Sequence, residues 1–325
     1  MPIISDLEPV QALERGQELG AGGFVAIDFE TATASRGSPC SVGLAEVDQG
    51  QVKDVHRWLI RPPGNQYDGF NISIHGIRPA MTINSPSFIE VWPEVMKVVG
   101  DRPLVAHYAP FDLGVLRDAL TLCNAPWPEL TYFCTRAMGR RAWPGRLSYR
   151  LVDLADECQI SFDHHEAGAD AATCALLAVA CAGAVGTDSL FDAVEKLRVR
   201  AGILGFGFWH GCTAIELSTS AQLSQMHPTT DIPEEGPFVG RRVVFTGTLD
   251  GMTRREAAQL ALNAGASVSE SMSKKVNFLV LGMQDANVVK DGVHSEKMLK
   301  AASLLESGVD IELLSEDDFY RMLHE

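Results

Sequence analysis

The sequence lacks the features expected of membrane, secreted or disulfide-linked proteins. No uncharged apolar run reaches the ~18 residues that a transmembrane helix needs. Residues 1–16 contain no basic stretch followed by an apolar core, so we expect no secretory signal. The seven cysteines are an odd number, lie apart and form no CxxC pair. This distribution argues against a disulfide framework and a zinc site, and it predicts a cytoplasmic protein.

Basic residues are also scarce. Lys and Arg number 27 against 42 Asp and Glu, which gives a formal net charge of −15. Such a balance argues against broad, sequence-independent binding to a polyanion. It is still compatible with a nucleic-acid enzyme, because local basic patches can bind phosphates and acidic residues can hold cations that face them.

Length and composition indicate a globular protein with two domains. The chain has 325 residues, of which 46% are hydrophobic and 21% charged. We predict a lead at 1–22, an α/β domain at 23–204, a turn-rich linker at 205–236 and a smaller α/β domain at 237–325. In the first domain the apolar patterns predict strands at 24–28, 42–47, 55–60, 104–106 and 131–134, and helices at 88–99, 111–122, 151–158 and 169–182. In the second they predict strands at 242–246, 278–281 and 311–313, and helices at 254–264, 294–306 and 316–323.

Four acidic residues stand at the ends of these elements. Asp28 and Glu30 are two apart on one strand and therefore share a face. Two carboxylates held together repel each other and are costly to bury unless a cation lies between them. The alternative is that one caps the next turn while the other is solvated. Asp112 and Asp170 each open a helix, where the alternative role is a favourable interaction with the helix dipole.

Together these segments resemble the three exonuclease motifs of the DEDDh family, which includes the proofreading epsilon subunit of bacterial DNA polymerase III and oligoribonuclease. The matching residues are Asp28-x-Glu30, Asp112 and His165-x4-Asp170, and Ile74 to Ile77 matches the family's HGI segment. The resemblance covers about Phe24 to Ala182 and implies a ribonuclease H-like domain, a mixed sheet flanked by helices.

The resemblance also implies a site and its cofactor. Asp28, Glu30 and Asp170 would bind Mg²⁺ or Mn²⁺, with Asp28 bridging to a second ion and Asp112 acting through coordinated water. The family spacing selects His165 as the general base and leaves His164 as a surface or partly packed residue. Three further residues would contact the substrate: Phe29, for which a core position is the alternative, Thr31 and His75.

Three features distinguish this chain within the resemblance. Tyr108 stands where the family often has Asn, and Glu166 where it often has Arg or Asp, which leaves substrate preference open more than activity. A third feature is an arginine-rich stretch without acids, interleaved with aromatics. The stretch comprises Arg136, Arg140, Arg141, Trp143, Arg146, Tyr149 and Arg150. It predicts either a binding path for a single nucleic-acid strand or a solvated helix face with a buried Trp.

Residues from 237 onward resemble a BRCT domain of the type found in bacterial NAD-dependent DNA ligase. The segments that carry the likeness are Gly240 to Leu249, Asn263 to Ala266 and Ser273 to Val280. The resemblance implies a pocket for a DNA 5′-phosphate, formed by Thr246, Gly247, Arg254 and Lys297 or Lys300. The alternative is a module that only binds proteins or dimerises.

These observations predict a metal-dependent 3′→5′ exonuclease that degrades DNA to nucleoside monophosphates. Its partners would be single-stranded 3′ ends, DNA ends bound through the BRCT module, and replication or repair proteins, with no membrane. A nucleoid-associated protein of the cytoplasm is expected. Two alternatives stay open: an exoribonuclease, because the motifs are shared, and a non-catalytic scaffold that acts through its BRCT domain.

Overall fold

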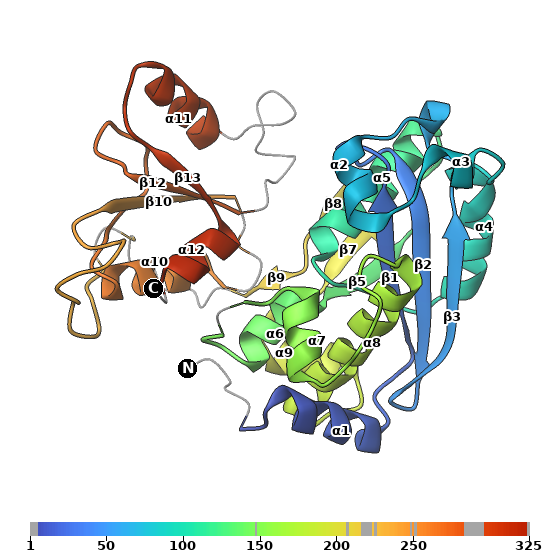
Figure 1. Cartoon of the computed structure of the whole chain (residues 1–325). Coiled ribbons are helices and arrows are strands. Elements are labelled where there is room, and N and C mark those ends of the chain that lie inside the picture. The colour runs from blue at the N-terminus through green and yellow to red at the C-terminus, as the bar shows by residue number, and fades with distance from the viewer. Residues whose placement is uncertain are drawn as a thin grey trace. The chain divides into compact units, whose positions relative to one another are not determined.

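The structure is a computed structural model, shown in Figure 1. It describes residues 6–146, 148–205, 208–215, 223, 226–247, 249, 252–282 and 296–323. Two compact units are present, one formed by Met1–Gly145 with Tyr149–Cys212 and the other by Arg146–Ser148 with Thr213–Glu325. Each is considered by itself below.

A seven-stranded mixed sheet forms the centre of the first unit. Its order is β3 (Gln51–Leu59), β2 (Pro39–Asp48), β1 (Phe24–Thr31), β4 (Leu104–Ala106), β5 (Leu130–Cys134), β7 (Gly202–Gly205) and β8 (Phe208–His210). Strands β1, β4 and β5 are parallel, and the outer pairs are antiparallel. Strand β8 falls within the range 205–236 that the sequence predicts as a linker.

Helices cover both faces of this sheet. Residues of α4 that lie three or four apart turn one apolar face inward, namely Phe88, Val91, Val95 and Val99. Phe88 contacts Phe29 of β1, with ring centroids 6.4 Å apart. The helices are α1 (Pro9–Leu19), α2 (Gly69–His75), α3 (Pro79–Thr82), α4 (Phe88–Val99), α5 (Ala109–Leu122), α6 (Thr135–Ala142), α7 (Leu151–Glu157), α8 (Ala167–Ala184) and α9 (Leu190–Lys196), followed by the short strand β6 (Val199–Arg200); the short strand β9 (Thr213–Ala214) belongs to the second unit.

Helix α8 is the core helix of this unit and crosses β1, β2 and β3 (Figure 1). Among the described residues it alone is long and apolar enough to span a membrane by length and composition, but 83% of it is buried inside the fold. Glycines allow its close packing. A Cβ on Gly16 of α1 would lie 2.1 Å from the Val179 carbonyl oxygen, and one on Gly43 of β2 would lie 2.0 Å from that of Ala167.

The second unit contains a four-stranded parallel sheet. Its order is β11 (Ser267–Ser269), β10 (Arg242–Thr246), β12 (Phe278–Leu281) and β13 (Glu312–Ser315), and its helices are α10 (Arg254–Asn263), α11 (Glu296–Glu306) and α12 (Glu316–Met322). Its core contains an aliphatic cluster around Val244 and Leu279 and a group of phenylalanines, in which the rings of Phe238 and Phe278 lie 5.4 Å apart and those of Phe245 and Phe319 lie 5.3 Å apart. The predicted α/β class, with a mixed sheet in the first domain and a small α/β domain after it, is confirmed.

Candidate active site

Three carboxylates meet at the carboxyl end of β1. Asp28 and Glu30 share one face of the strand, and Asp170 comes from the first turn of α8. Their nearest oxygens all lie within 4.8 Å of one another. The approach of α8 depends on Gly43, which pairs with Asp28 across β1 and β2 and leaves room for the backbone at Ala167.

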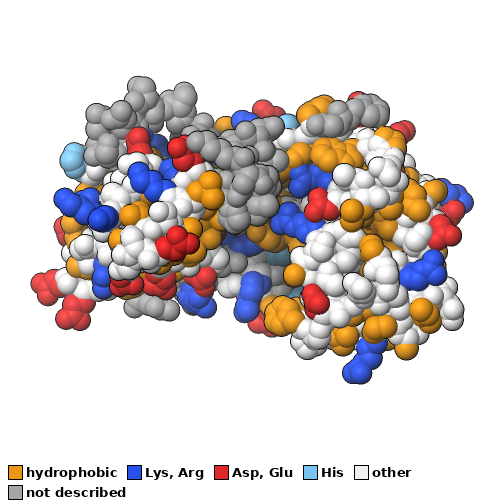
Figure 2. Space-filling model, turned by 90° about the horizontal axis from the view of Figure 1, so that it is seen from above, with side chains coloured by type: hydrophobic (Ala, Val, Ile, Leu, Met, Phe, Trp, Pro, Cys, Tyr) orange, Lys and Arg blue, Asp and Glu red, His pale blue; other side chains and the backbone are white. Residues whose placement is uncertain are grey.

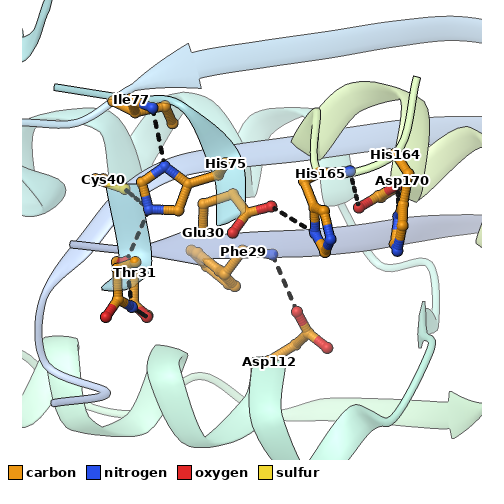
Figure 3. Close-up of polar contacts among 11 residues, drawn as sticks. Phe29, Glu30, Thr31, Cys40, His75, Ile77, Asp112, His164, His165 and Asp170 are labelled. Atoms are coloured by element: carbon orange, nitrogen blue, oxygen red, sulfur yellow. Dashed lines mark hydrogen bonds and ion pairs between the residues drawn. The ribbon is translucent and has the colours of Figure 1, made fainter. Parts of the chain in front are cut away.

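A fourth carboxylate, Asp112, reaches the same strand from the first turn of α5. Its Oδ1 atom accepts a hydrogen bond of 3.0 Å from the backbone N–H of Phe29, as Figure 3 shows. Only 1% of the residue is exposed. Asp112 therefore faces β1 between the positions of Asp28 and Glu30.

Burial and mutual repulsion raise the pKa values of these acids. Desolvation, followed by repulsion from Asp170 and Asp112, raises the pKa of Glu30 to about 8. The pKa of Asp28 is also raised well above its ordinary value, first by desolvation and then by Asp112 and Asp170. These carboxylates are costly to ionise together unless a cation lies between them. Their oxygen atoms and negative charge are what hard divalent cations require of their ligands. The residues thus fit a divalent metal site.

Two adjacent histidines lie beside the carboxylates. His165 Nδ1 is 4.0 Å from Glu30 Oε1, and the side chain is 41% exposed. Desolvation, with a smaller effect of His164, lowers the pKa of His165, so its imidazole stays neutral and able to accept a proton.

His164 also takes part in this arrangement. Its Nδ1 atom lies 3.1 Å from Asp170 Oδ1, and its ring stacks on that of His165 with centroids 3.8 Å apart. The left-handed backbone of His165, with φ of 69°, presents both rings to one region. The motif spacing selects only His165, so the sequence does not predict the contact between His164 and Asp170.

The three predicted substrate contacts differ in exposure. The Phe29 side chain is 2% exposed and lies in the core against Phe88, which fits the alternative interpretation. Thr31 is 6% exposed, and its carbonyl oxygen accepts from His75 Nε2 at 3.1 Å. Because Ile77 N–H donates to His75 Nδ1, His75 is the neutral Nε2–H tautomer, and burial lowers its pKa.

Asn71 of α2 is a contact that the sequence interpretation missed. Its Nδ2 group donates to the Thr31 carbonyl at 2.9 Å and to the Thr33 carbonyl at 3.2 Å. Asn71 and His75 therefore hold the end of β1 from the same helix. Glu166, the second departure from the family pattern, caps α8 by accepting from Ala169 N–H at 2.8 Å and pairs with Arg57 at 2.8 Å.

The arginine-rich stretch is not an exposed path, and both interpretations of it are wrong for α6. Arg136, Arg140 and Arg141 are only 4–8% exposed. Helix α6 packs with β5 and α8, so these side chains lie inside the fold, where Arg141 Nε donates to the Leu197 carbonyl at 3.1 Å. Trp143 is buried, as the second interpretation expected, and Arg150 is exposed but paired with Asp153 at 2.7 Å.

In the second unit, the predicted phosphate residues gather at the carboxyl end of β10. Arg254 Nη2 donates to the carbonyl of Gly247 at 2.8 Å, and Lys297 Nζ to that of Phe245 at 2.8 Å. Among the described residues, no acceptor lies within hydrogen-bond distance of the buried Arg254 Nε. Thr246 is 3% exposed, and Lys300 is exposed on α11. Desolvation and the nearby Arg254 charge lower the pKa of Lys297.

The face seen in Figure 2 carries charged side chains of both signs. Figure 2 shows acidic, basic and apolar side chains interspersed on the described part of the face in view, without a broad basic field.

Comparisons with known proteins show what the two parts of the chain are similar to. Residues 25–178 match the RNase_T exonuclease family, and residues 233–310 match the BRCA1 C Terminus (BRCT) domain. The 3′-5′ exonuclease DinG of Staphylococcus haemolyticus is 28% identical over 50% of this chain and 18% of its own length. A DNA ligase of Beijerinckia indica is 39% identical over 30% of this chain and 12% of its own length.

A solved structure of exonuclease X in complex with 5′ overhanging duplex DNA is also similar. It has 25% sequence identity and a TM-score of 0.45, and the match covers 54% of this chain and 99% of that one. The chain spans less than one fifth of the curated relatives named above. The matched segments nevertheless contain the motifs and the site residues described here. The chain therefore contains a segment that matches the exonuclease family, residues 25–178, followed by a segment that matches the BRCT domain, residues 233–310.

Proposed function

We propose that this protein is a metal-dependent 3′→5′ exonuclease that removes nucleoside monophosphates from the 3′ end of a DNA strand. The observation that carries the proposal is the meeting of Asp28, Glu30 and Asp170 within 4.8 Å, with His165 Nδ1 4.0 Å from Glu30. Such a cluster is unfavourable without a cation, and phosphodiester hydrolysis is the chemistry that carboxylate-bound metal ions with an adjacent base support.

Exonucleases of this family generally depend on divalent metal. We propose Mg²⁺ or Mn²⁺ in two positions, held by Asp28, Glu30 and Asp170, with Asp112 acting through water. The ions would supply charge stabilisation at the reacting phosphate. His165 would take a proton from the attacking water at an imidazole nitrogen, and the freed 3′ oxygen would leave as the P–O bond breaks. Asp170 would orient His165 by accepting its backbone N–H, 3.1 Å away.

For the BRCT domain we propose a 5′-phosphate site at the end of β10. Three features support an anion site there: Arg254 Nε has no hydrogen-bond partner in the described part of the chain, the Lys297 ammonium group lies close by, and Gly247 is left-handed with φ of 76°. Such a site would bring the nuclease to DNA ends. Association with replication or repair proteins through the same domain is the second possibility for this module.

The decisive experiment compares labelled single-stranded DNA, mismatched duplex and RNA, each with Mg²⁺, with Mn²⁺ and with chelator. We expect stepwise loss of nucleoside monophosphates from the DNA 3′ end only with metal, and none from the Asp28→Asn variant. Faster degradation of RNA would favour the exoribonuclease. No degradation of any substrate by a folded wild-type protein would leave the scaffold function.

A further inference from the structure

The edge of the sheet that carries the carboxylates also carries an exposed aromatic residue. Parallel strands β1, β4 and β5 end at the same edge, so the residues that follow them lie near one another. Tyr108 follows β4 and immediately precedes α5, four residues before Asp112. It is 40% exposed, although the neighbouring Ala109 and Pro110 are buried.

The backbone at this position is unfavourable for tyrosine. Tyr108 has φ of 63° and ψ of 52°, the left-handed region in which a bulky side chain is strained and Asn is tolerated. Asn is also the residue that the DEDDh motif often has at this place. The chain thus retains a ring where a smaller side chain would fit the backbone better. Strain of this kind persists where surrounding contacts impose it, and it is concentrated at functional sites.

A buried arginine supports the ring. The Arg136 guanidinium carbon lies 4.6 Å from the centre of the Tyr108 ring, and Arg136 is 8% exposed. The segment after β4 and the start of α6 are held together next to this contact, because His107 Nδ1 and Thr135 Oγ1 lie 2.9 Å apart, within hydrogen-bond distance. A guanidinium shielded from water attracts an aromatic face strongly. The ring is therefore fixed in orientation, while two-fifths of the residue's surface remains open to solvent.

We propose that Tyr108 is a stacking platform for a nucleobase of the substrate strand, and that Arg136 is its positioning residue. Single-strand-binding proteins use aromatic side chains in this way, and every base offers a π-face, so the contact would tolerate any sequence. A ring held at the same sheet edge as the carboxylates would stack on a base close to the scissile bond. Tyr108 can meet a base only if a strand enters this site, so the proposal rests on the exonuclease function.

The test measures binding separately from hydrolysis. In the full chain carrying Asp28→Asn, which blocks turnover, the Kd of a fluorescent single-stranded oligonucleotide is measured for Tyr108, Tyr108→Asn and Tyr108→Phe. We expect Tyr108→Asn to raise Kd roughly 5- to 100-fold and Tyr108→Phe to retain most affinity. Phe208→Asn, which removes another exposed ring, on strand β8, should leave Kd unchanged. The melting temperature of Tyr108→Asn should stay the same or rise, because Asn suits the left-handed backbone.

Abasic substrates make the result specific to stacking. Removing the base at one position near the 3′ end should raise the Kd of the Tyr108 protein by the same factor as the Tyr108→Asn substitution does. The abasic substrate should not raise the Kd of Tyr108→Asn any further. In the active background, Tyr108→Asn should raise KM with little change in kcat. Equal Kd values for Tyr108 and Tyr108→Asn, or equal abasic penalties in both, would overturn the proposal. Wild-type protein that neither binds nor degrades any strand would instead refute the exonuclease function.

Discussion

His164 and Asp170 are hydrogen-bonded through Nδ1 and Oδ1, 3.1 Å apart, and the other carboxylate oxygen of Asp170 accepts the backbone N–H of His165. One acid thus holds both histidines, but only His165 has a nitrogen within 4.0 Å of Glu30. The two adjacent residues therefore have different expected roles, one in proton transfer and one in orienting a carboxylate.

Replacing the two histidines separately tests this division. His165→Ala should lower kcat by ~10²–10⁴, the range for loss of a general base, with little change in metal affinity. His164→Ala should have a mild effect on kcat. Single-turnover hydrolysis and metal titration by calorimetry measure both quantities. A larger loss for His164→Ala than for His165→Ala would show that the motif spacing selects the wrong histidine.

The acid limb of the pH–rate profile should reflect the environment of His165. Desolvation lowers its pKa, and protonation of a base removes its activity below that pKa. Activity should consequently persist below pH 6.5 and decline only at more acid values. His165→Ala should lose this limb from its residual activity. A wild-type midpoint above pH 6.5 would contradict the assignment.

Metal-free stability should depend on pH through Glu30. Its pKa is about 8 in the folded chain against an ordinary 4.5, so the folded form holds its proton more tightly. The free energy of unfolding should therefore fall as pH rises from about 4.5 to about 8, by about 1.4 kcal/mol per pKa unit as an upper bound. Glu30→Gln removes this contribution, so its advantage over wild type should grow across that window in chelator. Denaturant unfolding at several pH values measures the difference. If the difference in free energy of unfolding between Glu30→Gln and wild type stays constant with pH, the expected cost of ionising Glu30 is refuted.

Gly43→Ala should separate the helix that carries Asp170 from the strand that carries Asp28. The new Cβ would lie 2.0 Å from the Ala167 carbonyl oxygen, which is backbone and cannot turn aside. We expect a loss of about 1–3 kcal/mol in stability, as for other overpacked sites, together with loss of hydrolysis. Gly69→Ala, at a glycine with no atom within 4 Å of the added Cβ, is the matched control and should change neither. Wild-type activity in Gly43→Ala would mean that α8 can shift without disturbing the site.

Arg254→Gln should remove recognition of 5′-phosphorylated ends. In the inactive Asp28→Asn full chain, 5′-phosphorylated duplex should bind more tightly than 5′-hydroxyl duplex, and added salt should weaken that preference. Arg254→Gln should abolish it, whereas Lys275→Gln, an exposed cation of the same unit, should keep it. Equal binding of both end types by the Arg254 protein would leave only the protein-interaction role for the BRCT domain.

Local sequence was sufficient for the bounds of α4 and β4, whereas β1, α5 and α8, which carry the motif acids, each extend beyond the predicted range. Helix α4 and strand β4 have the predicted bounds, because apolar periodicity and turn residues are properties of neighbouring positions. The placement of Asp28 and Glu30 on one face of a strand follows from the same period. Helices α2 and α6 were not predicted, since their sequences lack a continuous apolar stripe. Helix α2 has no buried residue, whereas every residue of α6 is buried.

The sequence by itself determined which residues could form the site: the acids, His165 and the order of the motifs that contain them. Only the tertiary structure decided which of these meet and what surrounds them. Three contacts illustrate this: His164 lies against Asp170, Arg136 is buried beneath Tyr108, and α8 lies close to Gly43. Each contact joins segments that are far apart in the sequence or residues in a turn with an unusual backbone conformation. Such contacts depend on the mutual packing of helices and sheet, and the burial that shifts the pKa values of the acids exists only once that packing has formed.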